Sequence, residues 1–142
     1  MATAKKKIVP EDYRPSEDEP FMNPVMLEYF RHKLVRWKTA ILRESTGTLQ
    51  HLQEENLQQP DIADRASRET DRALELRTRD RERKLLSKID KALQRIEEGT
   101  YGYCVETDEP ISIKRLEARP IATLSLEAQE YHERLERTHR DD

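Results

Sequence analysis

The stretch Pro60-Asp-Ile-Ala-Asp64-Arg-Ala66 decides how this chain folds, because it separates two long segments that both have helical spacing. Apolar residues before and after it recur in alternating steps of three and four over much of their length, as in a coiled-coil seam. Two long helices joined by a short turn pack antiparallel, so a helical hairpin is predicted. Its expected seam residues are Phe30, Leu34, Trp37, Ile41 and, after a polar gap, Thr48 and Leu52 in the first helix, and Ala66, Ala73, Leu76, Leu86, Ile89, Leu93 and Ile96 in the second.

Local signals mark where these helices begin and end. Asn23-Pro24 places a capping residue before a proline, which suits the first helical position. Pro60 stops the first helix, and either Asp61 or Asp64 can cap the second. Gly99 is suited to end the second helix because glycine readily adopts the left-handed conformation of a C-cap. The second helix is therefore expected to run from about residue 64 to 98.

Composition favours an extended helical protein over a large globular enzyme. Of the 142 residues, 39% are charged and 35% are hydrophobic, which supplies only a modest core. Residues 65–95 carry 11 basic and 6 acidic side chains, whereas 96–142 carry 6 and 12. A basic stripe of this kind indicates either an anionic partner or a solvated helix face with internal ion pairs. No phosphate-binding loop, nucleophile–base arrangement or metal-ligand set is found, so no catalytic residue is predicted and the chain is not expected to be an enzyme.

Cysteine content and hydropathy bear on the compartment. Cys104 is the only cysteine, so no internal disulfide can form and a reducing compartment is expected. The chain has no 18-residue apolar run and no apolar signal region. We therefore expect a cytoplasmic protein that does not bind membranes. A lone cysteine after Tyr-Gly-Tyr is interpreted as a small buried apolar residue, and a reactive thiol is the alternative.

Three further motifs carry a resemblance when they are taken together with the tip. They are Asp80-Arg-Glu-Arg-Lys84, Gly99-Thr-Tyr-Gly-Tyr-Cys104 and Arg115-Leu-Glu-Ala-Arg-Pro120. In this order they resemble the DksA/TraR family of bacterial transcription factors, and the resemblance extends from Phe21 to the C-terminal helix. It implies a small base with a zinc-ribbon-like knuckle of four cysteines. Here three of the four positions are Thr107, Ser125 and Ala128, with only Cys104 kept. Because structural zinc needs four thiolate or imidazole ligands, the resemblance implies a degenerate knuckle, no metal site and a zinc-independent variant.

The resemblance implies a site at the hairpin tip. Members of this family insert their coiled coil into the secondary channel of RNA polymerase, and the matching tip residues are Asp61, Asp64 and Ala66. The tip would act near the polymerase active site, where a carboxylate could perturb the bound Mg²⁺. The alternative is that the aspartates satisfy the free amides of the second helix. Both can hold, because one aspartate can cap while the other points outward.

A second implied site is a basic face on the second helix. Arg77, Arg81, Lys84 and Lys88 are spaced by four, three and four residues, so they share one side. By resemblance this face contacts the polymerase rim, and Lys88 helps to bind guanosine tetraphosphate (ppGpp) as an effector. On the alternative view, the stems of these side chains cover the hairpin seam. Gln129 matches a family position that is normally basic, which removes a charge from the nucleotide site.

The predicted fold class is mainly α: a long antiparallel coiled-coil hairpin with a small base domain, made of the degenerate knuckle and a C-terminal helix. Residues 1–26 form a partly extended segment that packs on the base, 27–98 form the hairpin with its tip at 60–64, and 99–142 form the base. Two short strands are expected around Ile111 and Ile113, and a helix over 124–137. Apolar side chains expected to pack in the base are Phe21, Met26, Tyr101, Tyr103, Ile111, Ile113, Leu116 and Ile121, with Leu126, Tyr131 and Leu135 of the terminal helix packing back onto it.

As a function, the resemblance implies a monomer that binds RNA polymerase without sequence-specific DNA contacts. With guanosine tetraphosphate it would repress ribosomal RNA promoters and activate some amino-acid promoters in the stringent response. No structurally bound cofactor is expected. The alternative from another class is a helical-hairpin adaptor or structural interaction protein without a polymerase role.

Overall fold

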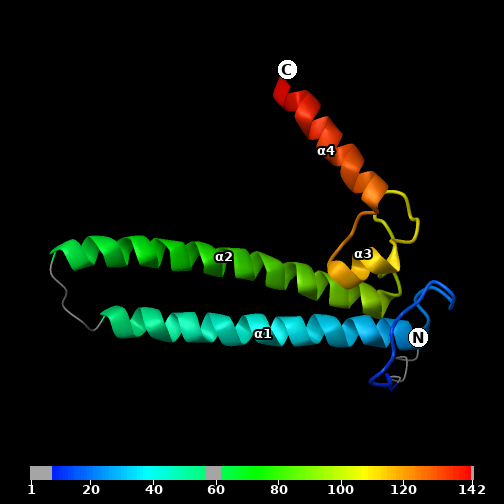
Figure 1. Cartoon of the computed structure of the whole chain (residues 1–142), viewed down its shortest axis with the longest axis horizontal. Coiled ribbons are helices and arrows are strands. Elements are labelled where there is room, and N and C mark those ends of the chain that lie inside the picture. The colour runs from blue at the N-terminus through cyan, green and yellow to red at the C-terminus, as the bar shows by residue number, and fades with distance from the viewer. Residues whose placement is uncertain (1–7, 57–61, 142) are drawn as a thin grey trace. The chain divides into compact units, whose positions relative to one another are not determined.

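Four helices make up the described part of the chain: α1 (Pro24–Asn56), α2 (Ile62–Glu98), α3 (Ile113–Ala118) and α4 (Leu126–Asp141) (Figure 1). The computed structural model describes the backbone of residues 8–56 and 62–141, and the side chains of 8–47 and 65–139. The chain divides into two units. The hairpin unit is Val35–Asp90, and the base unit is the chain up to Leu34 and from Lys91 onward. The mainly helical fold with two long helices is as predicted.

The first helix begins as its sequence predicts. The Asn23 side-chain oxygen accepts hydrogen bonds from the amides of Val25 and Met26, both at 3.1 Å. Pro24 occupies the first helical position, where its missing amide proton costs no helical hydrogen bond. This cap confirms the predicted start of α1.

The second helix also ends as predicted. Gly99 has a φ of 80°, its amide donates to the Ile96 carbonyl at 3.3 Å, and the Thr100 amide donates to the Arg95 carbonyl at 2.9 Å. This pair of hydrogen bonds is the Schellman arrangement, which satisfies two of the free carbonyls of the last turn. At the other end α2 begins at Ile62, two residues before the predicted start, so Asp64 lies within the first turn and the option that it is the N-cap is wrong.

Within the hairpin unit, α1 and α2 run antiparallel. The Lys38 ammonium contacts the Asp90 carboxylate at 2.6 Å, and the Ser45 hydroxyl donates to Glu82 at 2.6 Å. Residues later in α1 therefore pair with residues earlier in α2, which confirms the predicted antiparallel direction. The buried apolar residues described in this unit are Ile41 and Ile89.

The seam of α2 follows a different row from the predicted one. Ala66, Ala73 and Leu76 are exposed, so their predicted place in the seam is wrong. The buried Ile89 is preceded at intervals of seven by half-buried polar residues: Glu82, Glu75 and Arg68. The heptad row that is set by Ile89 thus contains polar side chains toward the tip, and the alanines lie off that row. Cross-helix polar contacts such as Ser45–Glu82 take the place of apolar packing there.

An aromatic and aliphatic core holds the base unit together. Phe30 packs on Tyr101 with ring centroids 5.6 Å apart, and Leu34 and Leu116 are also fully buried. The Tyr101 hydroxyl is satisfied by donating to the Pro120 carbonyl at 2.8 Å, since a buried polar group without a partner is costly. The predicted core residues that are buried are Met26, Tyr101, Ile111, Ile113, Leu116 and Ile121.

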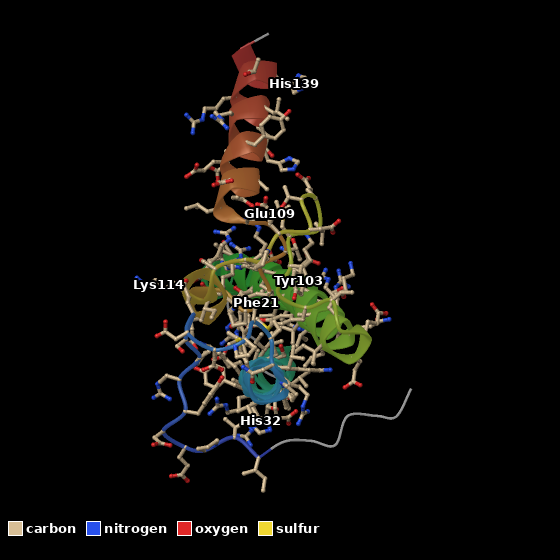
Figure 2. All side chains as sticks on the ribbon, turned by 90° about the vertical axis from the view of Figure 1, so that its right-hand side faces the viewer. Phe21, His32, Tyr103, Glu109, Lys114 and His139 are labelled. Atoms are coloured by element: carbon tan, nitrogen blue, oxygen red, sulfur yellow. The ribbon has the colours of Figure 1, made fainter. Side chains whose placement is uncertain are left out.

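Two details of the base differ from the sequence-based expectation. The segment around Ile111 and Ile113 forms no strand in the described chain; it forms an isolated bridge between Tyr103 and Pro110, and Ile113 begins α3. The reason is local, because the Ser112 side chain caps α3 by accepting from the Arg115 amide. Tyr103 lies at the surface, where its ring packs edge-on against Phe21 at 5.2 Å (Figure 2).

The terminal helix starts two residues later than predicted and does not bury its large apolar side chains. Leu126, Tyr131 and Leu135 are 58%, 53% and 39% exposed, so the prediction that they pack back onto the base is wrong. In their place the small Ala128 is buried. The first turn of α4 is anchored by the small side chain, and the rest of the helix presents its residues to solvent. None of the helices in the described residues is long and apolar enough to cross a membrane.

Candidate functional site

The predicted tip residues are only partly described. Asp61 lies outside the described residues, and at Asp64, in the first turn of α2, only the backbone is described. Ala66 lies one half-turn further along α2 and is exposed. The roles of Asp61 and Asp64 stay predictions.

The basic face of α2 is solvent-exposed. Arg77, Arg81, Lys84 and Lys88 are all exposed in one helix, and their spacing places them on one side of it. The side chains that are half-buried in this stretch are others, among them Thr78 and Arg79. This exposure leaves the four charged ends free to meet a partner, and both the binding role and the alternative in which the stems cover the seam stay predictions.

One carboxylate adjoins this face. Asp80 contacts the Arg83 guanidinium at 2.6 Å and the Lys84 ammonium at 3.2 Å. The hydrogen bond from Lys84 is the main reason that the pKa of Asp80 is lowered, so this carboxylate is ionised at neutral pH. Lys84 shares its charge with Asp80, and the face is less uniformly positive at this point than the sequence suggests.

Gln129 belongs to the base unit. It lies half-buried in α4, and its side-chain amide donates to Glu133 one turn later at 3.3 Å. The position therefore carries a neutral group that is engaged along its own helix.

The knuckle keeps its turn geometry although most cysteines are missing. The Cys104 amide donates to the Glu109 carbonyl at 2.8 Å, and the Asp108 amide donates back to the Cys104 carbonyl at 2.9 Å. Asp108 and Gly102 both have positive φ, at 60° and 91°. A Cβ on Gly102 would lie 2.8 Å from the flexible end of the Met22 side chain, and the positive φ is the main reason that glycine is needed here.

The residues at the former ligand positions have other structural tasks. Thr107 accepts a hydrogen bond from the Glu109 amide at 3.3 Å. Ser125 caps α4, since its hydroxyl accepts from the Ala128 amide at 3.2 Å and its carbonyl accepts from the Gln129 amide at 2.9 Å. Ala128 contributes a buried methyl group.

This donor set does not fit a zinc ion. One thiol, two hydroxyls and a methyl group cannot supply four thiolate or imidazole ligands. Among the described residues there is also no group of three or more His, Cys, Asp or Glu side chains that could hold a metal.

The Cys104 thiol lies in a ring of donors. The residue is 1% exposed, and such burial by itself raises the pKa of a thiol. Hydrogen bonds from the Thr107 hydroxyl and from the amides of Ser125, Thr107 and Glu106 outweigh the burial and lower the pKa to about 6. A pKa of about 6 favours the thiolate form of Cys104 at neutral pH. The interpretation of Cys104 as a simple apolar residue describes its burial but misses this charge.

Two further contacts join the knuckle to the segment around α4. The Val105 amide donates to the Thr123 carbonyl at 2.9 Å, and the His132 ring contacts the Glu106 carboxylate. Together with the Cys104–Ser125 hydrogen bond, these contacts join the same two segments that a zinc site would join.

Two polar contacts that position the base are not apparent from the sequence. Lys33 contacts Glu117 twice, at the carboxylate (2.8 Å) and at the backbone carbonyl (2.7 Å), and so connects α1 to α3. The Arg115 guanidinium donates to the Leu124 carbonyl at 2.8 Å. No sequence signal identifies Lys33 and Glu117 as partners, because 84 positions separate them. Arg115 lies in the motif Arg115-Leu-Glu-Ala-Arg-Pro120, whose sequence does not reveal this structural role.

These features define a class: a helical-hairpin protein whose base carries a knuckle of zinc-ribbon type without the ligands for zinc. Comparison with known families gives the class its name. Residues 26–96 match the family described as "DnaK suppressor protein DksA, N-terminal domain", and residues 99–134 match "Prokaryotic dksA/traR C4-type zinc finger".

Similar proteins point to the same family. The chain is 67% identical, over its full 142 residues and all of the relative, to an RNA polymerase-binding transcription factor DksA from Caulobacter vibrioides. It is 43% identical to the Escherichia coli K12 protein of that name, over 82% of this chain and 78% of the relative. Transcription factor DksA2 from Pseudomonas aeruginosa has a similar structure, with a TM-score of 0.77 and 43% identity over 82% of this chain and 90% of that one. The chain belongs to the DksA family.

Proposed function

We propose that this protein is a transcription regulator that binds RNA polymerase directly. The observation that carries the proposal is its end-to-end similarity to the Caulobacter vibrioides protein, whose name states that activity. The long hairpin with an exposed basic face supports it, since such a surface suits docking on a larger acidic partner. We propose further that it acts in the cytoplasm as a monomer, without sequence-specific contacts to DNA and without catalysis of its own.

The hairpin enters the secondary channel of the polymerase, and the tip acts near the active site. Asp61, Asp64 and Ala66 are the residues proposed to act there. A carboxylate near the catalytic Mg²⁺ changes the local field and so destabilises the open promoter complex. This mechanism represses ribosomal RNA promoters and activates some amino-acid promoters.

Guanosine tetraphosphate is the proposed effector at the polymerase interface. Arg77, Arg81 and Lys84 contact the polymerase rim, and Lys88 contacts the nucleotide through charge-assisted hydrogen bonds. Gln129 supplies no positive charge, and its amide is engaged with Glu133. The nucleotide response is therefore weaker than in a relative that has a basic residue at this position.

The test is multi-round transcription in vitro from a ribosomal RNA promoter, with Caulobacter vibrioides polymerase and metal-free protein, with and without the nucleotide. Inhibition that the nucleotide deepens is expected. Asp64→Asn should lose this inhibition while it keeps nearly full affinity for the polymerase, because the tip acts after docking. No inhibition by a folded protein would favour an adaptor role, and a large loss of affinity in Asp64→Asn would contradict the tip mechanism.

The protein also folds and acts without zinc, in our proposal. Chelators should leave its melting temperature unchanged, since hydrogen bonds from the amides around Cys104 and the cap at Ser125 stabilise the knuckle in place of a metal. The matched comparison is the variant Thr107→Cys, Ser125→Cys, Ala128→Cys, which restores four thiols and should lose stability when a chelator is added. A clear chelator effect on the natural chain would overturn the proposal.

A further inference from the structure

A groove in the base unit lies outside all the sites described above. It has a volume of about 320 Å³ and lies between the N-terminal segment and the start of α3. Its residues are Glu17, Glu19 and Phe21 on one side and Pro110, Ile111 and Ile113 on the other. Small-molecule sites usually range from about 300 to 1,000 Å³, so this groove has room for one or two side chains.

The floor of the groove is apolar and fixed. Ile111 is fully buried and Ile113 nearly so, which places both in the core of the base. Phe21 is held by its edge-on contact with Tyr103 (Figure 2). The Ser112 hydroxyl also borders the groove, but it is occupied as the cap of α3. Because Ile111 and Ile113 have almost no exposed surface, the apolar contact to an occupant comes mainly from the half-buried Phe21 and the exposed Pro110 above them.

The rim of the groove is acidic. Glu17 is exposed, and Glu19 is held by the Tyr13 hydroxyl and by the Asn23 amide at 2.8 Å. The hydrogen bond from Tyr13 is the main reason that the pKa of Glu19 is lowered, so its charge persists at neutral pH. Residues 11–19 contain five acidic side chains and one basic one, Arg14, which donates to the Tyr13 carbonyl at 2.9 Å.

The combination of floor and rim selects the occupant. Phosphates and nucleotides are repelled by the two carboxylates, and a purely apolar side chain would cover the Glu17 carboxylate without giving it a hydrogen-bond partner. Arginine and lysine satisfy both surfaces, because their stems pack on apolar groups while the charged end reaches the carboxylates. Lys114 follows Ile113 in the chain but does not line the groove, so it does not occupy the site.

We propose that this groove binds a segment of a partner polypeptide that carries an arginine or lysine beside an apolar residue. The site is separate from the basic face of α2 and needs neither the polymerase nor a nucleotide. Its occupation would fix the N-terminal segment against α3 and give the base a contact of opposite charge to that of the hairpin.

The test uses the full chain with ¹³C-labelled isoleucine methyl groups and three probes. They are the blocked peptide Ala-Arg-Leu-Arg-Ala, its counterpart Ala-Glu-Leu-Glu-Ala, and spermidine as a cation without a peptide backbone. The basic peptide should shift the Ile111 and Ile113 methyl signals in a saturable way that weakens with added salt. The acidic peptide should leave them unchanged, and spermidine should shift them less than the basic peptide does.

The matched variants separate the groove from the general negative charge of the segment. Glu17→Lys should weaken binding of the basic peptide by about fivefold or more, because an attraction at the rim becomes a repulsion. Glu17→Gln should give a smaller loss. Asp12→Lys changes the net charge equally but does not line the groove, and it should leave the affinity within about twofold. Thermal melting of each variant checks that it is folded.

Equal weakening by Asp12→Lys and Glu17→Lys would show that only the diffuse charge of the segment is sensed, and it would overturn the proposal. Unshifted Ile111 and Ile113 signals, or equal binding of spermidine and the peptide, would also overturn it. Because no polymerase is present, each of these results is independent of the transcription test.

Discussion

The base unit and the hairpin unit use the same two long helices but are stabilised in different ways. In the base, Phe30, Leu34, Tyr101 and Leu116 form a fully buried core. In the hairpin, the described residues bury Ile41 and Ile89, and polar pairs such as Ser45–Glu82 join the helices beyond them. The stability of the fold therefore depends mainly on the base, while the hairpin presents a charged surface.

This difference also predicts where the molecule opens first. Regions with few buried apolar contacts exchange their amide protons through local opening at a lower free energy than the core does. The polar row of Arg68, Glu75 and Glu82 should therefore be less protected than the segment around Phe30. A hairpin with a polar seam can adapt to a partner without unfolding the base that supports it.

The strongest test of this comparison is Phe30→Ala. The variant leaves a cavity beside Tyr101 in the base core, so it should lose about 3–5 kcal/mol of the free energy of unfolding. Urea unfolding followed by circular dichroism measures the loss. Tyr131→Ala is the control, because Tyr131 is exposed in α4, and it should change the free energy by about 0.5 kcal/mol or less. Similar losses in both variants would contradict the assignment of the core.

The next effect concerns pH and Cys104. The folded-state pKa of about 6 lies below the ordinary value of 9.0, so the thiolate stabilises the fold fully only above the unfolded pKa. This contribution is lost as the pH falls from 9 through 6, and its full size above pH 9 should be on the order of 4 kcal/mol.

Urea unfolding at several pH values, under reducing conditions, measures this contribution as the difference between the natural chain and Cys104→Ser. The difference should grow as the pH rises from about 6 to 9, because serine stays neutral over this range. A difference that is independent of pH would show that the thiol is not ionised by its amide donors.

Local signals in the sequence predicted the helix ends well. Asn23 and Gly99 act through hydrogen bonds to residues within one or two turns, and such bonds depend little on the rest of the fold. The buried aromatic and aliphatic residues of the base were also predicted, because large apolar side chains in a charged chain have few other places.

The packing of residues that are far apart in the sequence was not predictable from the sequence alone. The seam of α2 between 65 and 84 has too few apolar residues to fix its row, so the alanines were assigned to it in place of Glu75 and Glu82. The exposed face of α4 could not be foreseen, since its apolar spacing is the same whether the helix packs or not. The donors around Cys104 come from two segments that only the fold brings together.

The smallest expected change in stability is the most informative about the hairpin. Lys88→Ala removes an exposed side chain from the basic face, so the free energy of unfolding should stay within about 0.5 kcal/mol. If the hairpin serves as a binding surface, the same variant should lose most of the nucleotide-dependent part of transcription inhibition and keep the nucleotide-independent part.

Arg83→Ala is the matched control for Lys88→Ala. Arg83 is equally basic and exposed but lies on a different side of α2, next to Asp80. It should leave both the stability and the nucleotide response unchanged. If Arg83→Ala reduced the response as much as Lys88→Ala does, the partner would sense only the total positive charge of the hairpin. A selective loss in Lys88→Ala would instead show that the partner recognises one face of α2. The polar composition of the hairpin would then serve binding at the expense of apolar packing.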